Sequence, residues 1–345
     1  MIPIQNIYYM LSYAFQVLNE QGYKNIATEQ FNNTGELMAA ILEKGIAIQI
    51  KRGLGKEYIL QTEALSSLQG KIDIAESIKT QSMLRKQLIC TYDEFSVNSI
   101  MNRIIKSTVE LLLRSNISKQ RKKNLRKLMV YFSEVDFIDL YTVNWNVQYN
   151  RNNQTYRMLI SICYLVVKGL LQTQSNGHTK LMDFLDEQRM CRLYEKFILE
   201  YYRKEFKNQF TANASQIPWQ LDNEENSMLP VMQSDIMLQS GEKVLIIDAK
   251  YYEHSTQVQF DKHTLHSGNL YQIFTYVKNK EYELREKNHT VSGMLLYAKT
   301  DEEIYPNNVY QMSGNQITVR TLDLNLPFDE IAGQLNTIAK THFDL

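Results

Sequence analysis

The sequence predicts an α/β (α+β) protein with two domains: a mostly helical N-terminal domain at 1–175, and a C-terminal domain at 176–345 with a mixed central sheet flanked by helices. The chain has 345 residues, which is enough for two cores. Apolar residues follow helical spacing through much of the first half, whereas helices and short strands alternate from about residue 187. A polar stretch with a glycine at 172–179 is typical of a linker.

The helices of the first domain are predicted from apolar side chains that recur at i, i+3 and i+4. They are expected at 6–18, 34–43, 98–114 and 156–171. Thr34 is a suitable N-cap for the second of these helices.

A small β-rich insertion is expected among these helices at about 45–95, because the hydrophobic period changes there. Strands are predicted at 46–50, 57–62, 68–74 and 86–92. The segment Arg52-Gly-Leu-Gly-Lys56 would join the first two strands as a hairpin turn.

One dense basic run, Ser118-Lys-Gln-Arg-Lys-Lys-Asn-Leu-Arg-Lys, follows the third helix. We interpret it as the solvated outer face of a helix whose inner face carries Leu125, Leu128 and Met129. Contact with a DNA backbone or with an acidic partner is the alternative interpretation.

The second domain shows an alternation of helices with short apolar runs. Helices are predicted at 188–206, 269–280 and 328–342, and strands at 210–217, 228–238, 242–252, 290–298, 309–312 and 316–322. Gln239-Ser-Gly supplies the turn between the second and third strands.

Composition sets limits on location and partners. Lys+Arg and Asp+Glu both count 38, so any contact with DNA needs a local basic surface or a partner. Cys90, Cys163 and Cys191 are scattered, which fits a reducing compartment and argues against a zinc ribbon. The N-terminus lacks the features of a signal peptide, and the apolar run at 159–171 is too short to cross a bilayer. We therefore expect a cytoplasmic protein.

The stretch at 244–252 carries the main chemical signal. Val244-Leu-Ile-Ile predicts a strand buried on both faces, and it leads directly into Asp248-Ala249-Lys250. Because side chains alternate along a strand, Asp248 and Lys250 project from the same face. A solvated salt bridge at a strand end is one interpretation, and a hydrolytic site with a metal and a lysine is the other.

A second carboxylate, Asp235, lies on the strand predicted to pair with this one through a tight turn. Asp235 and Asp248 can therefore reach one divalent cation, and hard oxygen ligands favour Mg²⁺. The Ala249 carbonyl is a further candidate ligand. Lys250 would orient or deprotonate a water, or stabilise negative charge at phosphorus. A second ion would clamp the attacking and leaving oxygens.

The helix that follows adds Gln272 and Tyr276, which lie on one face because they are four residues apart. They would position a DNA phosphate or a water. The preceding helix offers Glu195 as another carboxylate, although Glu187 and Glu200 are equally acidic alternatives. No GxxxxGK[ST], GxGxxG or GxSxG motif is present, so the chain shows no signature of a nucleotide site or a serine hydrolase.

The order Asp235…Asp248-Ala-Lys250…Gln272-x-x-x-Tyr276 resembles the PD-(D/E)xK nuclease superfamily, in its branch with a QxxxY motif. Ser234 stands where the superfamily name has proline. Further segments in both halves resemble the McrC family, the nuclease subunit of the McrBC modified-cytosine restriction system. These segments are Ile2-Pro-Ile-Gln-Asn-Ile-Tyr-Tyr-Met-Leu-Ser-Tyr-Ala, Leu68-Gln-Gly-Lys-Ile, Asn102-Arg-Ile-Ile-Lys-Ser-Thr, Asp248-Ala-Lys-Tyr-Tyr and Asn269-Leu-Tyr-Gln.

The resemblance implies a division of labour between two chains. The 176–345 domain would be a PD-(D/E)xK endonuclease acting with Mg²⁺ on double-stranded DNA that carries modified cytosine. The 1–175 domain would dock on an McrB-like AAA+ GTPase hexamer, which binds the GTP, and would stimulate its hydrolysis. Part of that domain enters the ring pore in the family, and we expect the Arg52–Lys56 tip of the insertion to do so.

Two other functions remain open from the sequence alone. The chain would be a ring-binding regulator if its nuclease fold were vestigial, although the intact acid pair and lysine argue against decay. It would be a stand-alone, structure-specific nuclease if the purified chain cut DNA without a partner or GTP.

Overall fold

The computed structural model describes residues 2–15, 18, 23, 26, 29, 31, 33–150, 153–175, 187–222, 228–252, 257–259, 262–299 and 305–345. Contacts between Cα atoms divide the chain into two compact units. We call Thr28–Phe184 the helical unit, and Met1–Ala27 together with Leu185–Leu345 the sheet unit. None of the helices in the described ranges has the length and apolarity needed to span a bilayer.

The helical unit is built on long helices, three of which begin at a polar N-cap. Its long helices are α2 Thr34–Arg52, α4 Ile100–Arg114, α5 Lys119–Met129 and α6 Tyr156–Ser175. The side chains of Asn33, Ser99 and Ser118 accept hydrogen bonds from the first turns of α2, α4 and α5. Fully buried aliphatic side chains such as Ile41 and Ile104 form the core between these helices.

Helix α2 extends beyond its predicted end, so the strand expected at 46–50 is wrong. These residues complete a helix that reaches Arg52. Ile46 is fully buried there, so it lies in the core of the helical unit. The helix ends at Gly53, whose φ of 94° only glycine adopts readily, and Lys51 and Arg52 in the last turn complement the helix dipole. A glycine that suits a hairpin turn serves here as a helix cap.

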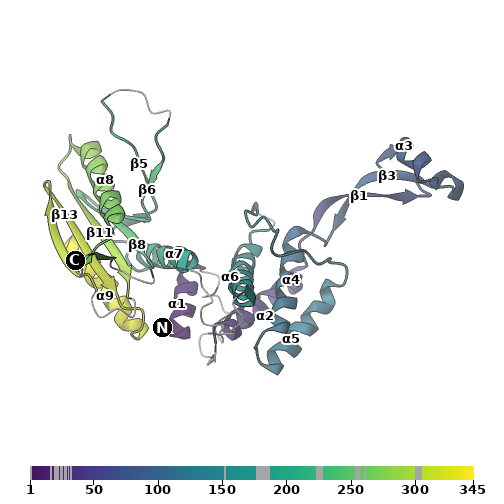
Figure 1. Ribbon diagram of the computed structural model, residues 1–345, viewed down its shortest axis with the longest axis horizontal. Coiled ribbons are helices and arrows are strands. Elements are labelled where there is room, and N and C mark those ends of the chain that lie inside the picture. Colours follow the sequence, from purple (N-terminus) through teal and green to yellow (C-terminus); the bar gives the residue numbers. More distant parts are fainter. Residues whose placement is uncertain are drawn as a thin grey trace. The chain divides into compact units, whose positions relative to one another are not determined.

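A three-stranded antiparallel element, which we call the arm, extends from the helices between α2 and α4 (Figure 1). Its parts are β1 Glu57–Leu65, β2 Lys71–Asp73, α3 Ile74–Lys79, the 3₁₀ helix η3 Ser82–Arg85 and β3 Leu88–Ser96, with the strand order β1-β3-β2. A Cβ on Gly70, which has a φ of 63°, would lie 2.3 Å from the Thr91 carbonyl oxygen, so the turn before β2 requires glycine.

The arm corrects the predicted insertion in two ways. It covers 57–96 instead of about 45–95. The segment Arg52–Lys56 links α2 to β1 and therefore lies at the base of the arm, whereas α3 and η3 form its far end (Figure 1). The prediction that Arg52–Lys56 forms the tip is wrong, because residues 46–50, which were expected to form the strand before it, are part of helix α2.

A buried hydrogen-bond network holds the base of the arm. The Asn102 side chain on α4 donates to the carbonyls of Gly55 and Val97, at 2.9 and 2.8 Å, and accepts from the Tyr156 hydroxyl at 2.8 Å. That hydroxyl accepts from the Gly55 N–H at 2.7 Å. Gly55 lies where the chain enters the arm, and Val97 lies where it leaves. The Asn102 side chain therefore holds both ends of the arm.

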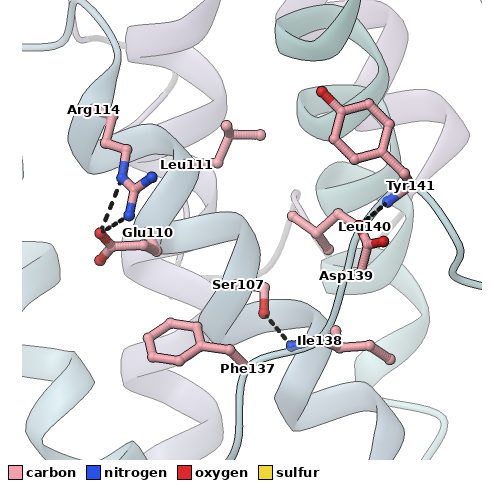
Figure 2. A pocket seen from close by; sticks show the side chains of 9 residues that line it. All are labelled: Ser107, Glu110, Leu111, Arg114, Phe137, Ile138, Asp139, Leu140 and Tyr141. Atoms are coloured by element: carbon pink, nitrogen blue, oxygen red, sulfur yellow. Dashed lines mark hydrogen bonds and ion pairs between the residues drawn. The ribbon is translucent and has the colours of Figure 1, made fainter.

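A groove lies between α4 and the segment 137–141 in the same unit (Figure 2). It has a volume of about 550 Å³, and the Glu110–Arg114 ion pair stands at its side. The Ser107 hydroxyl accepts a hydrogen bond from the Ile138 N–H at 2.9 Å and so ties the segment to α4. Phe137 remains more than half exposed beside this groove.

The sheet unit contains a mixed six-stranded sheet with the order β12-β13-β11-β8-β7-β4. Its strands are β4 Thr211–Asn213, β7 Ile236–Ser240, β8 Lys243–Lys250, β11 Thr290–Ala298, β12 Asn308–Met312 and β13 Asn315–Leu322. The central pairs β8–β11 and β11–β13 are parallel, and the other pairs are antiparallel. The predicted mixed sheet is thus confirmed.

Helices cover both faces of this sheet (Figure 1). Helix α8, Ser267–Leu284, packs on β11 and β8, and its Ile273 and Val277 belong to the same buried cluster as Val244 and Ile246 of β8. Gly293 permits this close approach, because a Cβ there would lie 2.8 Å from Ile273. Helices α7, Glu187–Glu205, and α9, Phe328–Phe343, belong to the other face and are joined by a Tyr202–Leu335 hydrogen bond. Short ladders pair β5 Gln216–Ile217 with β6 Met232–Gln233, and β9 Gln257–Gln259 with β10 Lys262–Thr264.

The N-terminal helix α1, Ile4–Ala14, packs against α7 in the sheet unit, although its residues lie within the predicted 1–175 domain. The Asn6 amide donates to the carbonyls of Leu324 and Leu326 at 2.7 and 2.8 Å. Tyr9 stacks on Phe328 with 4.4 Å between ring centroids. The first McrC-like segment therefore fastens α1 to the loop before α9.

Candidate active site

Strand β8 delivers an acid and a base to one point, as its sequence predicts. Val244 to Ala249 are buried, and the side chains of Asp248 and Lys250 are only 1% and 13% exposed. The Lys250 ammonium donates to Asp248 Oδ1 at 3.0 Å. Asp248 Oδ2 lies 2.9 Å from the same nitrogen, within ion-pair distance, but accepts no hydrogen bond from the described residues. The ion pair therefore leaves one buried carboxylate oxygen without a hydrogen bond.

Asp235 reaches this point because the predicted strand at 228–238 is broken in two. Strand β6 ends at Gln233 and β7 begins at Ile236, so Ser234 and Asp235 form the bend between them. Ser234 is buried, and its N–H donates to the Ser215 carbonyl at 3.0 Å. Asp235 Oδ2 then accepts from the Ala249 N–H at 2.9 Å. The register β7–β8 ends at Ile236 and Ile247, so Asp235 lies next to Asp248 beyond the last ladder pair.

The protonation of this cluster reflects its burial. Burial raises the pKa of Asp248 to about 7; the Lys250 ammonium opposes that shift, and the charge of Asp235 adds to it. Burial lowers the pKa of Lys250, but the charge and hydrogen bond of Asp248 raise it above the ordinary lysine value. Both pKa shifts indicate that the negative charge of the buried Asp248 carboxylate is unfavourable unless a cation lies nearby. The Lys250 ammonium provides part of that compensating positive charge.

Helix α8 brings the predicted glutamine to the lysine. Gln272 Oε1 lies 3.5 Å from the Lys250 ammonium, and its amide donates to the Tyr276 hydroxyl at 2.9 Å. Tyr276 is buried in the core between α8 and the sheet. The structure thus brings together Asp235, Asp248, Lys250 and Gln272, with Tyr276 holding the glutamine from behind.

Three further residues, Asn269, Tyr252 and Tyr297, support this arrangement, and sequence reasoning gave them no role. Asn269, one turn before Gln272, donates to the Tyr297 hydroxyl at 3.0 Å and accepts from the Tyr252 hydroxyl at 3.2 Å. Tyr297 is fully buried on β11, directly beside Lys250 in the parallel register. This network anchors the start of α8 to the strands that carry the site. The spacing Asn-x-x-Gln on one helix face was the available signal.

Helix α7 adds Glu195, the third carboxylate considered from the sequence. Its Oε1 accepts from the Cys191 thiol at 3.0 Å, and that sulfur lies 3.9 Å from the Ala249 carbonyl oxygen. Burial, and then the charge of Asp235, raise the pKa of Glu195. Glu200 instead pairs with Arg203 at 2.7 Å, and the side chain of Glu187 lies outside the described residues. Glu195 is thus the acid of α7 that borders the site.

The donor set can be tested for Mg²⁺ from the chemistry of its atoms. No group of three or more His, Cys, Asp or Glu side chains in the described part of the chain is gathered as a ready metal cage. Mg²⁺ does not need one, since it is commonly held by one or two carboxylates together with waters and substrate phosphates. Asp235 and the unsatisfied Asp248 Oδ2 supply two such ligands, and the Ala249 carbonyl points to the same strand edge as its N–H. The residues fit the ion.

Comparison with known proteins places the chain in a family. The family model described as "McrBC 5-methylcytosine restriction system component" matches residues 5–298. The chain belongs to the McrBC family. The match runs through both units and includes each of the four residues that the structure gathers.

The chain is also similar to individual proteins. The chain is 29% identical over 330 residues to the type IV methyl-directed restriction enzyme EcoKMcrBC of Escherichia coli K12, covering 94% of this chain and 93% of the relative. Among solved structures, it is similar to a half-complex of Thermococcus gammatolerans McrB AAA+ hexamers with bound McrC. That match has a TM-score of 0.48 at 18% identity and covers 97% of this chain and 76% of the other. The T. gammatolerans McrBC complex matches with a TM-score of 0.42 at 20% identity over 59% of each chain.

Proposed function

We propose that this chain is the DNA endonuclease subunit of a GTP-dependent, methylcytosine-directed restriction complex. The observation that carries the proposal is the meeting of Asp235, Asp248 and Lys250 at one strand edge, with an unsatisfied carboxylate oxygen beside the lysine. We infer that these residues form the donor set of a PD-(D/E)xK nuclease site. Membership of a restriction-system family supports hydrolysis of a DNA phosphodiester.

Each residue of the site has a proposed task. Asp235, Asp248 and the Ala249 carbonyl would hold Mg²⁺, with Glu195 completing the set. When bound, the ion would polarise a phosphoryl oxygen and neutralise charge. The Lys250 ammonium, held between Asp248 and Gln272, is placed to orient the attacking water or to stabilise negative charge that develops at phosphorus. Gln272 would fix the lysine in that position.

GTP would be bound and hydrolysed by a partner subunit and not by this chain. This sequence contains no phosphate-binding loop, and its family is described as a component of a restriction system. The relative from E. coli bears the name of a methyl-directed restriction enzyme. We therefore propose that the helical unit docks on an McrB-like AAA+ GTPase ring and stimulates its GTP hydrolysis, and that the DNA carries modified cytosine.

The far end of the arm is the proposed pore-entering element. It exposes apolar side chains to solvent: Leu68, Ile74, Ile78, Met83 and Leu84 are between 53% and 81% exposed. A concentration of exposed apolar residues on a projecting element is typical of a protein interaction site. Arg52 and Lys56, at the base, are replaced in this role by the residues of α3 and η3.

Reconstitution tests this function. The chain purified with its ring partner should cut DNA containing 5-methylcytosine only when GTP and Mg²⁺ are both present. Neither protein alone should cut, because the nuclease site and the GTPase lie on different chains. The measurement is conversion of supercoiled plasmid to linear product, with unmethylated plasmid as the control. Equal cutting by the chain without partner or GTP would indicate a stand-alone nuclease instead.

A further inference from the structure

Helix α5 carries a stripe of cations on its outer face. Its members are spaced i, i+3, i+4, i+7 and i+8, which places them on one side of the helix. They are Lys119, Lys122, Lys123, Arg126 and Lys127. None of the five side chains has an ion pair or hydrogen bond with any residue that the structure describes. We call this set the α5 stripe.

The side chains on the opposite face of α5 have partners within the helical unit. Leu125 is fully buried there. Arg121 binds the carboxylates of Glu29, Glu36 and Glu43, at 2.8, 3.3 and 2.9 Å respectively. The helix therefore divides the basic run at 118–127 into one internal cation with three partners and five outward-facing cations that have none among the described residues.

Repulsion among the cations of the α5 stripe destabilises the helix that carries them. Like charges four residues apart, such as Lys119–Lys123 and Lys122–Arg126, repel each other. The first turn of α5 contains no acidic residue, and the Glu36 carboxylate, which accepts hydrogen bonds from the Ser118 N-cap, forms its ion pair with Arg121 and not with Lys119. Nothing in the fold of the described residues uses these charges, so their arrangement indicates an external anionic partner.

We infer that the α5 stripe binds the phosphate backbone of DNA, which gives this chain an affinity for DNA outside its nuclease site. A phosphate backbone needs cations alone, whereas a helix face that docks on protein usually also carries apolar anchors. The stripe contains none; the exposed apolar residues Val130 and Tyr131 come only after α5 ends. From Lys119 to Lys127 the helix rises about 12 Å, which is enough to meet about two or three phosphates.

The inference rests on the proposed function only in taking DNA as the polymer. It is tested by binding, not by cleavage. Lys122→Gln/Lys123→Gln/Arg126→Gln removes the centre of the stripe and also relieves its repulsion, so the variant should fold normally by circular dichroism. Affinity of the full chain for an unmethylated 30-base-pair duplex is measured by fluorescence anisotropy without ring or GTP, in EDTA so that no cleavage occurs.

Relative to the unaltered chain, the variant should bind the duplex at least about 10-fold more weakly at 150 mM salt, and the slope of log K against log salt should fall in magnitude by about 2. The matched control is Lys44→Gln/Lys51→Gln/Arg52→Gln, which removes three exposed cations of α2 that have no ion pair in the described part of the chain, and it should leave both quantities unchanged. Unchanged DNA binding with lost ring binding would make the stripe a docking site for an acidic protein. No change in either would make it a solvated face. Both results overturn the inference, while neither bears on whether the complex cuts DNA.

Discussion

Replacing Asp248 with asparagine is expected to reduce DNA cleavage by the reconstituted complex at least about 1,000-fold. Asparagine has nearly the same volume, so the buried position stays filled. It removes the charge that pairs with Lys250, and it replaces one of the two carboxylate oxygens that could bind a metal ion. Initial rates of plasmid cleavage in the presence of the ring partner, GTP and Mg²⁺ measure the effect.

The same preparation provides the control. Stimulation of GTP hydrolysis should stay within about twofold of the unaltered chain, because no residue of the helical unit changes. Asp222→Asn, at an exposed carboxylate of the sheet unit, should leave both activities intact. Loss of GTPase stimulation together with cleavage would assign Asp248 to folding, and persistent cleavage would remove it from the active site.

Replacing Asn102 with alanine should lower the free energy of unfolding of the helical unit by about 3 kcal/mol. Asn102 is fully buried and makes three hydrogen bonds, so its loss leaves the Gly55 and Val97 carbonyls without that donor. Tyr156→Phe removes one hydroxyl from the same network and should cost about 1–2 kcal/mol. Urea unfolding followed by circular dichroism measures both.

The position of the arm should change along with this stability. Since Asn102 ties the chain where it enters and leaves the arm, the alanine variant should stimulate GTP hydrolysis less than Asn116→Ala, an exposed asparagine of the same unit. A stability loss below about 1 kcal/mol would show that the network does not hold the arm.

The chemistry of the site could be predicted from the sequence because its signal is local. Asp248 and Lys250 share a face through the alternation of one strand, and Gln272 and Tyr276 share a face through one helical turn. Even so, the sequence did not show that the strand before Asp235 breaks. That bend depends on the Ser234–Ser215 pairing, which joins segments 19 residues apart.

Long-range contacts explain most of what the sequence did not reveal. Helix α1 belongs to the sheet unit because Asn6 meets carbonyls more than 300 residues away, a pairing that no local pattern contains. Residues 46–50 alternate like a strand, yet tertiary packing of Ile46 keeps them helical. Gly53 suits either a hairpin turn or a helix end. Because it ends α2 in the structure, the arm begins after it and not before it.

Direct binding of a divalent cation tests the central claim, that Asp235 and Asp248 form a metal site beside Lys250. Mn²⁺, which has similar ligand preferences to Mg²⁺, can be titrated into the purified chain with and without a DNA duplex and followed by electron paramagnetic resonance. The unaltered chain should bind Mn²⁺. Asp235→Asn/Asp248→Asn should bind it at least about 10-fold more weakly while remaining folded, and Glu195→Gln should give a smaller loss. Equal Mn²⁺ affinity in the folded double variant, or no binding by the unaltered chain even with DNA, would contradict the claim.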